Sequence, residues 1–262
     1  MIPRDYINQW SQQVPWQSFP MVEQDLIISR ALIELFKQEK TRQSLVFRGG
    51  TALNKLYLNP PARYSEDIDF VQRNPEPIGE TITAIRSVLD SWLGKPKRKL
   101  TERSVKLIYQ YENIEQTKAK LKIEINTVEH LSVLAPQIIE HRVDSPWFRG
   151  AGSIHTYSLE ELMATKLRAL YQRRKGRDLF DVWFVCTQNT INIPLMIDIF
   201  KEYCAHDGIV ISKDDFIANL NLKKTNRDFQ VDMSVLLPKT GLVVWNFEQA
   251  FDCVQNRIVN HL

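Results

Sequence analysis

The sequence predicts an α+β protein in which a small mixed sheet precedes a helical C-terminal domain. Residues 44–71 read as a strand, a glycine pair, a helix and a second strand. Within residues 104–128, two more segments alternate apolar and polar side chains, as half-buried strands do. From residue 158 onward, apolar residues recur at the spacing of helices. We therefore expect a sheet-containing domain over residues 1–155 and a helical domain over residues 156–262.

Length and composition are those of an ordinary globular protein. The 262 residues are 44% hydrophobic and 25% charged, with a formal net charge of +3. No apolar run approaches the length of a membrane span, and the N-terminus lacks the layout of a signal peptide, so we expect a cytoplasmic protein. Cys186, Cys204 and Cys253 are widely spaced in apolar helical context. This spacing predicts buried thiols and argues against a disulfide framework or a zinc site.

The chain before the second strand supplies an arm, a helix and a glycine turn. Residues 1–20 are aromatic and proline-containing and predict no definite structure, whereas residues 21–40 carry an apolar helical face. A short apolar strand at residues 44–47 ends at Gly49-Gly50, where a helix begins. A backbone without Cβ atoms can approach a phosphate closely, although most glycine pairs at a turn serve only the turn.

Asp67 and Asp69 alternate with the apolar residues Ile68 and Phe70. At the two-residue period of a strand, both carboxylates leave one face while the apolar side chains enter the core. Neighbouring carboxylates repel each other unless a cation lies between them. Hard oxygen ligands near a glycine turn predict a site for Mg²⁺, with Mn²⁺ as the alternative ion, and for a nucleoside triphosphate. A solvated strand edge is the competing interpretation.

The middle of the chain predicts one helix and two strands. Residues 78–93 form an amphipathic helix that ends near Gly94, and strands follow at about residues 104–111 and 118–128. In the second of these strands, Glu124 points away from the side chains that enter the core. Glu124 is therefore either a third site carboxylate or a simple surface residue.

The composition turns irregular between residues 136 and 152, which predicts a domain boundary, and a short strand at residues 154–157 follows. Beyond the next two helices, the chain reads as further helices whose apolar positions are most simply core and packing surface. We place them at about residues 194–206, 212–220, 226–237 and 242–262.

Two helices follow residue 157. Ser158 to Glu161 form a capping box that opens a helix through about Arg174. In this helix the stem of Lys166 lies on the apolar side, which is costly unless the amine meets a negative group.

The next helix carries Asp178 and Asp181 in its first turn, where the helix dipole favours carboxylates. Arg177 can pair with Asp181 at i, i+4, so we assign Asp181 a mainly structural role.

Cationic residues gather in two clusters, and each is either a solvated face or a surface that binds the phosphates of a nucleotide or an RNA. The first cluster comprises Lys95, Lys97, Arg98, Lys99, Arg103 and Lys106, and the second comprises Arg168, Arg173, Arg174, Lys175 and Arg177.

Three segments resemble, in order, motifs of the AbiEii/AbiGii group of nucleotidyltransferases, which are relatives of the polymerase-β-like superfamily. The segments are Gly49-Gly50-Thr51-Ala52-Leu53, Arg63-Tyr64-Ser65-Glu66-Asp67-Ile68-Asp69-Phe70, and Lys166 followed by residues 175–183, KGRDLFDVW. The resemblance covers about residues 45–185 and implies a polymerase-β-like nucleotidyltransferase fold.

The resemblance also implies roles for individual residues. Asp67 and Asp69 would hold two Mg²⁺ ions, and Glu124 would be the third carboxylate, at a position where the family usually has Asp. Gly49, Gly50, Thr51 and Ser65 would bind the nucleotide phosphates. Lys166 would touch the nucleotide, and Asp178 would assist catalysis.

The implied reaction transfers a nucleotidyl group from an NTP to a hydroxyl and releases pyrophosphate. By resemblance, the chain would be the toxin of a bacterial toxin–antitoxin or abortive-infection pair, with an antitoxin protein as partner. An RNA such as a tRNA 3′ end is the expected acceptor, bound by the second cationic cluster. The alternatives are transfer to a small molecule or a protein hydroxyl, and a non-catalytic nucleotide-binding module.

Overall fold

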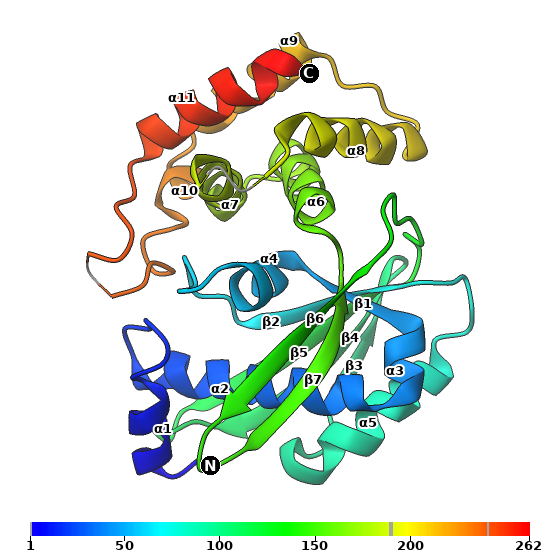
Figure 1. Ribbon diagram of the computed structural model, residues 1–262, viewed down its shortest axis with the longest axis vertical. Coiled ribbons are helices and arrows are strands. Elements are labelled where there is room, and N and C mark those ends of the chain that lie inside the picture. Colours follow the sequence, from blue (N-terminus) through cyan, green and yellow to red (C-terminus); the bar gives the residue numbers. More distant parts are fainter. Residues whose placement is uncertain (1, 189–190, 240) are drawn as a thin grey trace. The chain divides into compact units, whose positions relative to one another are not determined.

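The computed structural model describes residues 2–188, 191–239 and 241–262 (Figure 1). The chain forms two compact units. Unit 1 comprises Met1–Leu131 and Pro136–Tyr157, and unit 2 comprises Ser132–Ala135 and Ser158–Leu262. Within the described residues, no helix is long and apolar enough to cross a membrane.

Unit 1 is built on a seven-stranded mixed sheet with the order β3-β4-β5-β2-β1-β7-β6 (Figure 1). The strands are β1 (Leu45–Arg48), β2 (Asp67–Gln72), β3 (Lys97–Leu100), β4 (Ser104–Glu112), β5 (Lys118–Asn126), β6 (Gln137–Asp144) and β7 (Arg149–Thr156). The pairs β2–β5 and β1–β7 are parallel, and the other neighbours are antiparallel. The predicted mixed α and β architecture is confirmed, on a larger sheet than expected.

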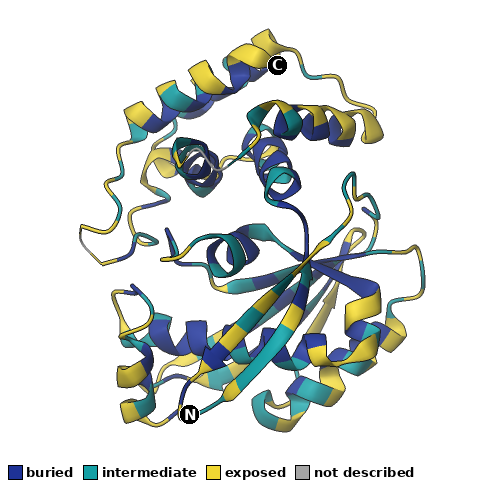
Figure 2. Cartoon of the chain, in the orientation of Figure 1, coloured by how far each residue is buried: buried dark blue, intermediate teal, exposed yellow. Residues whose placement is uncertain are grey.

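The alternating residues of the central strands separate the two faces of this sheet. One face carries the buried side chains Ile68 and Phe70 of β2, which lie beside the equally buried Ile123 and Ile125 of β5. Helices α2 (Phe19–Lys37) and α5 (Gly79–Leu93) supply further buried side chains to the core. Figure 2 shows how much of α2 is buried. The acidic residues of β2 and β5 leave the opposite face.

Local signals explain where several helices begin and end. The Ser18 hydroxyl accepts a hydrogen bond from the amide of Met21 and caps α2. That helix ends at Lys37, earlier than predicted, because Gln38 is extended, and α3 (Glu39–Ser44) follows. At the glycine turn, α4 (Gly49–Ala52) continues into the π-helical segment η1 (Leu53–Tyr57).

The prediction of an irregular boundary over residues 136–152 is wrong. These residues belong largely to a hairpin of β6 and β7, and β7 joins the sheet beside β1. A Cβ atom on Gly152 would lie 3.3 Å from the Cα atom of Ile33. The glycine that suggested a loop therefore allows α2 to pack closely on a strand.

The N-terminal arm, for which the sequence predicted no structure, is anchored by one buried carboxylate. Helix α1 (Arg4–Trp10) ends in Trp10, whose indole N–H donates to Asp25 at 2.9 Å. The indole of Trp16 donates to the same carboxylate at 2.8 Å, and the Lys55 amine lies 2.8 Å from it. All four side chains are almost inaccessible to solvent.

Unit 2 is helical, as predicted. Its elements are α6 (Leu159–Gln172), α7 (Gly176–Thr187), α8 (Ile193–His206), α9 (Lys213–Lys224), α10 (Arg227–Val231), α11 (Phe247–Arg257) and the 3₁₀ turn η2 (Val259–His261). The two last predicted helices are too long. Helix α10 stops at Val231, and α11 begins only where Asn246 accepts a hydrogen bond from the amide of Gln249.

The predicted capping box of α6 is used differently by its two residues. The Ser158 hydroxyl accepts a hydrogen bond from the amide of Glu161, as expected. The fully buried carboxylate of Glu161 accepts hydrogen bonds from the amides of Val133 and Leu134 and from the hydroxyl of Tyr203. Glu161 therefore ties the segment Ser132–Ala135 and helix α8 to α6.

Replacing Asp25 with alanine should destabilise unit 1 by about 3–5 kcal/mol, because it leaves a buried lysine and two indole N–H groups without their acceptor. Urea unfolding measures the change. Asp144→Ala, which removes an ion pair with Arg149 whose side chains are both about three-quarters exposed, is the control and should cost less than about 1 kcal/mol. Equal losses in the two variants would show that Asp25 does not anchor the arm.

Candidate active site

Both glycines of the turn after β1 lie against side chains of the candidate site. Gly49 has φ of +83°, and a Cβ atom there would come 2.6 Å from the Oδ2 atom of Asp69. A Cβ atom on Gly50 would come 2.3 Å from a guanidinium nitrogen of Arg63. Gly49 is thus favoured both by its positive φ and by the close approach of Asp69, whereas a side chain at Gly50 would have to displace the guanidinium of Arg63.

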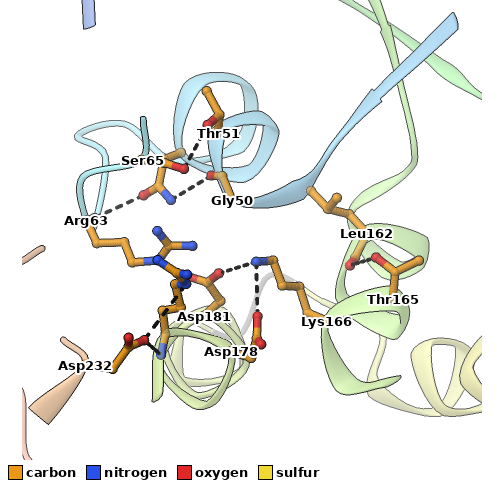
Figure 3. Close-up of polar contacts among 12 residues, drawn as sticks. Gly50, Thr51, Arg63, Ser65, Leu162, Thr165, Lys166, Asp178, Asp181 and Asp232 are labelled. Carbon is orange, nitrogen blue, oxygen red and sulfur yellow. Dashed lines mark hydrogen bonds and ion pairs between the residues drawn. The ribbon is translucent and has the colours of Figure 1, made fainter. Parts of the chain in front are cut away.

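Thr51 fixes the start of the acidic strand. Its buried hydroxyl hydrogen-bonds the carbonyl oxygen of Asp67 and the hydroxyl of Ser65, the latter at 2.8 Å (Figure 3). Asn54, one turn later, donates to the carbonyl oxygen of Gly50 at 2.9 Å. Thr51 therefore acts as a positioning residue, whereas Ser65 is only partly buried.

The strand register brings the predicted acids together on one sheet face. Asp69 of β2 lies opposite Glu124 of β5 on one side and Arg48 of β1 on the other. Asp67 lies opposite Lys122 of β5. The sequence expectation that Asp67, Asp69 and Glu124 share a face is met by these pairings.

Lysines neutralise two of the three carboxylates. The Lys122 amine lies 2.7 Å from Asp67 and 3.5 Å from Glu124. The Lys106 amine lies 2.9 Å from Glu124, and the Ser104 hydroxyl donates to Glu124 at 3.0 Å. Burial alone would lower the pKa of Lys122 and raise that of Glu124, but these contacts raise the first pKa and lower the second.

Asp69 differs from the other two acids. Burial and the nearby negative charge of Asp67 raise the pKa of Asp69 above its ordinary value, although Arg48 and Lys122 oppose the shift. Desolvation and the charge of Asp67 therefore both disfavour the ionised form of Asp69. A divalent cation between Asp67 and Asp69 would favour that ionised form.

The residues present fit a magnesium ion through two carboxylates. The described residues contain no group of three or more His, Cys, Asp or Glu side chains arranged to hold a metal ion. Mg²⁺, however, is commonly held by one or two carboxylates together with substrate phosphates, and Asp67 and Asp69 supply such a pair. Glu124 would have to leave Lys106 and Lys122 before it could become a third ligand.

Unit 2 contains a separate buried cluster of charges (Figure 3). The Lys166 amine lies 2.8 Å from Asp181 and 3.4 Å from Asp178, and both carboxylates are inaccessible to solvent. Arg173 donates two hydrogen bonds to Asp178, at 2.7 and 2.9 Å. Burial alone would raise the pKa of Asp178, but Lys166 and Arg173 lower it. The expectation that the Lys166 amine meets negative groups is confirmed.

The local pairing predicted between Arg177 and Asp181 gives way to longer-range contacts. The backbone amide of Arg177 donates to Asp232 at 3.1 Å, and its side chain lies 3.9 Å from the same carboxylate. A Cβ atom on Gly176 would lie 2.1 Å from the carbonyl oxygen of Phe229. The first turn of α7 therefore packs tightly against α10 and the turn after it.

Sequence comparison identifies the family. A profile described as the nucleotidyltransferase AbiEii toxin of type IV toxin–antitoxin systems matches residues 30–253. The chain belongs to the AbiEii family of nucleotidyltransferase toxins. It is thus a nucleotidyltransferase, and a type IV toxin–antitoxin system implies an antitoxin as its partner.

Solved structures share the fold of this AbiEii toxin. MenT4, a nucleotidyltransferase toxin from Mycobacterium tuberculosis H37Rv, matches with a TM-score of 0.71 and 17% identity over 100% of this chain and 91% of that chain. JHP933 from Helicobacter pylori matches with a TM-score of 0.56 and 17% identity, covering 93% of each chain. Among curated protein sequences, none matches the chain.

The expected acceptor-binding cations of the AbiEii toxin occupy different environments. Arg168 is buried, pairs with Asp207 at 3.1 Å and lies over the ring of Tyr203, so its guanidinium serves packing. Arg173 is half-exposed but binds Asp178. Exposed side chains are found at Arg174 and Lys175.

Sequence reasoning missed the lysines of the acidic face. Lys122 and Lys106 each contact an acid that was predicted, but only Lys122 could have been found by its spacing. Lys122 is two residues before Glu124 on the same strand, so the two-residue period places it on the same face. Lys106 required the register of β4 against β5, which is a non-local property.

Asp69→Asn should stabilise the metal-free protein at neutral pH by an amount of the order of 1 kcal/mol, because it removes a carboxylate whose ionisation opposes folding. A raised pKa in the folded state means that Asp69 favours folding when protonated, and that this advantage is lost as the pH rises through the folded-state pKa. The gain from asparagine should therefore vanish below the ordinary aspartate pKa of about 4. Urea unfolding with EDTA, measured from pH 3 to pH 7, tests this dependence.

Asp67→Asn is the matched control, since it deprives the half-buried Lys122 of its nearest carboxylate and should not stabilise the protein. A stabilisation by Asp69→Asn that did not change with pH would contradict the electrostatic explanation.

Proposed function

We propose that this AbiEii toxin uses Mg²⁺ to transfer a nucleotidyl group from an NTP to a hydroxyl of RNA, such as the 3′ end of a tRNA. The observation that carries the proposal is the pairing of Asp67 and Asp69 on one sheet face, with Asp69 against Gly49 and its pKa raised by burial and by the charge of Asp67. Such a pair favours a divalent cation, and the exposed cations of unit 2 favour a polyanionic acceptor.

Asp67 and Asp69 would hold the metal. Bound Mg²⁺ would neutralise the triphosphate and stabilise the departing pyrophosphate, and Mn²⁺ could substitute. The backbone of Gly49 and Gly50 would lie against the phosphates, with the hydroxyl of the partly exposed Ser65 beside it. Thr51 would hold this backbone segment in position, because its hydroxyl already hydrogen-bonds Ser65 and the carbonyl oxygen of Asp67.

In the reaction, an acceptor hydroxyl oxygen would form a bond to the α-phosphorus of the NTP. The bond from that phosphorus to the bridging oxygen of pyrophosphate would break, and the hydroxyl proton would pass to a base or to solvent. The sheet face would contribute mainly by positioning and electrostatic stabilisation, as is usual for transfer at phosphorus.

Lys122 would act as the positive charge of the site before the nucleotide binds. Its amine already pairs with Asp67 and approaches Glu124. A divalent ion at Asp67 would weaken this pairing, and the amine would then be available to a phosphate. Glu124 would hold Lys106 and Lys122 in place, or would join the metal as the family pattern implies.

The roles of Lys166 and Asp178 are proposed from the family motifs that they match. Lys166 would contact the nucleotide, and Asp178 would assist catalysis. Their ion pairs support a further role in folding, because loss of either partner leaves a buried charge. Asp181, whose carboxylate lies nearest to the Lys166 amine, is assigned this role in folding.

Among the cations of unit 2, the exposed Arg174 and Lys175 are the best acceptor contacts, and Arg177 is half-buried beside Asp232. An NTP donor and a tRNA acceptor would place the toxin in the cytoplasm with its antitoxin. Transfer to a small molecule or a protein hydroxyl is the second candidate, since the acidic face would serve any hydroxyl. Membership of a nucleotidyltransferase family removes the non-catalytic alternative.

Asp67→Asn and Asp69→Asn should each lower nucleotidyl transfer at least about 100-fold, because each removes a charged ligand that stabilises the reacting phosphates. The assay incubates purified protein and Mg²⁺ with each labelled NTP and total cellular RNA. Label entering protein or small molecules instead of RNA would favour the second candidate.

Glu66→Gln is the control for this assay. Glu66 immediately precedes β2, is exposed and carries the same charge, so its loss should leave transfer near the wild-type rate. Near-normal transfer by either aspartate variant would show that the catalytic site lies elsewhere.

A further inference from the structure

The acidic sheet face continues without interruption to a basic edge strand. Asp69 lies opposite Glu124, Glu124 lies opposite Lys106, and Lys106 lies opposite Lys99 of β3. Strand β3 is the last strand on this side of the sheet, and its side chains are exposed. A straight cross-strand row therefore leads from the candidate catalytic carboxylates to the sheet edge.

The neighbouring row has the same character. Asp67 lies opposite Lys122, Lys122 lies opposite Ile108, and Ile108 lies opposite Lys97 of β3. Neighbouring strands are about 4.8 Å apart, so β3 lies about 14 Å from β2. Lys97 and Lys99 thus stand on the face of the acids, within reach of an extended substrate that begins at Asp67 and Asp69.

Arg98 of the same strand faces the other way. It lies opposite Leu107, whose side chain belongs to the buried core, and Leu100 lies opposite the buried Val105. Since successive strand residues alternate between faces, Lys97 and Lys99 share the acidic face while Arg98 leaves the opposite one. Lys97 and Lys99 can therefore contact a substrate bound at the acidic face, whereas Arg98 cannot.

The two outer lysines have no carboxylate to neutralise them. Lys106 is bound to Glu124, whereas Lys97 and Lys99 make no ion pair within the part of the chain that the structure describes. One acid, Glu102, is found in the adjoining turn, beside the exposed Arg103. Uncompensated charge at the end of a row that starts at a catalytic site is suited to a substrate that carries several negative charges.

We propose that Lys97 and Lys99 bind the phosphates of the acceptor RNA that trail away from its reacting end. The inference rests on the proposed function, because it assumes that the acceptor hydroxyl is placed at Asp67 and Asp69. An RNA end fits this row better than a small acceptor does, because a single hydroxyl-bearing molecule at the acids would not extend over three strand spacings. Lysines bind phosphates as flexible point charges, so the contacts secure the backbone and read no sequence.

The test compares Lys97→Gln and Lys99→Gln with Arg98→Gln, which removes one positive charge from the opposite face of the same strand. Binding of bulk tRNA labelled with fluorescein at its 5′ end is followed by anisotropy at several salt concentrations. Each lysine variant should bind several-fold more weakly, with a salt slope reduced by about 0.7, the value for one single-strand phosphate contact. Arg98→Gln should keep the wild-type affinity and slope.

All three variants should keep the wild-type melting temperature, since the side chains are exposed, and the wild-type affinity for Mg²⁺ with an NTP. Equal weakening by Arg98→Gln, no weakening by either lysine variant, or no tRNA binding by the wild type would overturn the proposal. A protein that binds tRNA through Lys97 and Lys99 but transfers no nucleotide to any RNA would overturn the proposed function and leave this surface assigned. Binding of labelled polyglutamate through Lys97 and Lys99, at protein concentrations where tRNA does not bind, would overturn the proposal and assign the surface to an acidic protein partner instead.

Discussion

The candidate site of unit 1 depends on two carboxylates that are held side by side on one face of a sheet. Asp67 and Asp69 repel each other, and Lys122 and Arg48 on the flanking strands offset this repulsion. The pKa of Asp69 nevertheless stays raised, because burial adds to the effect of the Asp67 charge. A metal ion bound with the proposed nucleotide would offset the charge of both carboxylates.

Much of the surrounding fold serves to keep this face in place. The side chains on the other face of β2, Ile68 and Phe70, are buried. A shift of the strand register by one residue would therefore bury the carboxylates and expose the core side chains. Gly49 and Gly50 leave room for Asp69 and Arg63, and the Thr51 hydroxyl holds the carbonyl oxygen of Asp67. Unit 2 also holds two neighbouring acids, Asp178 and Asp181, and both are buried. Lys166 neutralises both carboxylates, and Arg173 also pairs with Asp178.

The sequence was sufficient where the signal is local. The alternation in β2, β4 and β5, the amphipathic α5 and the face shared by Asp67, Asp69 and Glu124 follow from periods of two or 3.6 residues within one segment. The hairpin of β6 and β7 was missed because glycine is typical of loops, whereas Gly152 lies in a strand and allows close contact with Ile33. Strand β3 was missed because an exposed edge strand carries few apolar residues. The pairings of Lys106 with Glu124 and of Arg177 with Asp232 depend on register and tertiary packing, which no local pattern encodes.

The role of Asp67 and Asp69 is tested most directly by locating the metal with paramagnetic Mn²⁺ and a non-hydrolysable NTP analogue, using NMR of the labelled protein. If Asp67 and Asp69 hold the metal, the amide signals of Gly49, Asp67 and Asp69 should broaden first, and Asp69→Asn should abolish this broadening at the same ion concentration. Broadening centred elsewhere, or unchanged in the variant, would contradict the assignment of the metal to this pair of carboxylates.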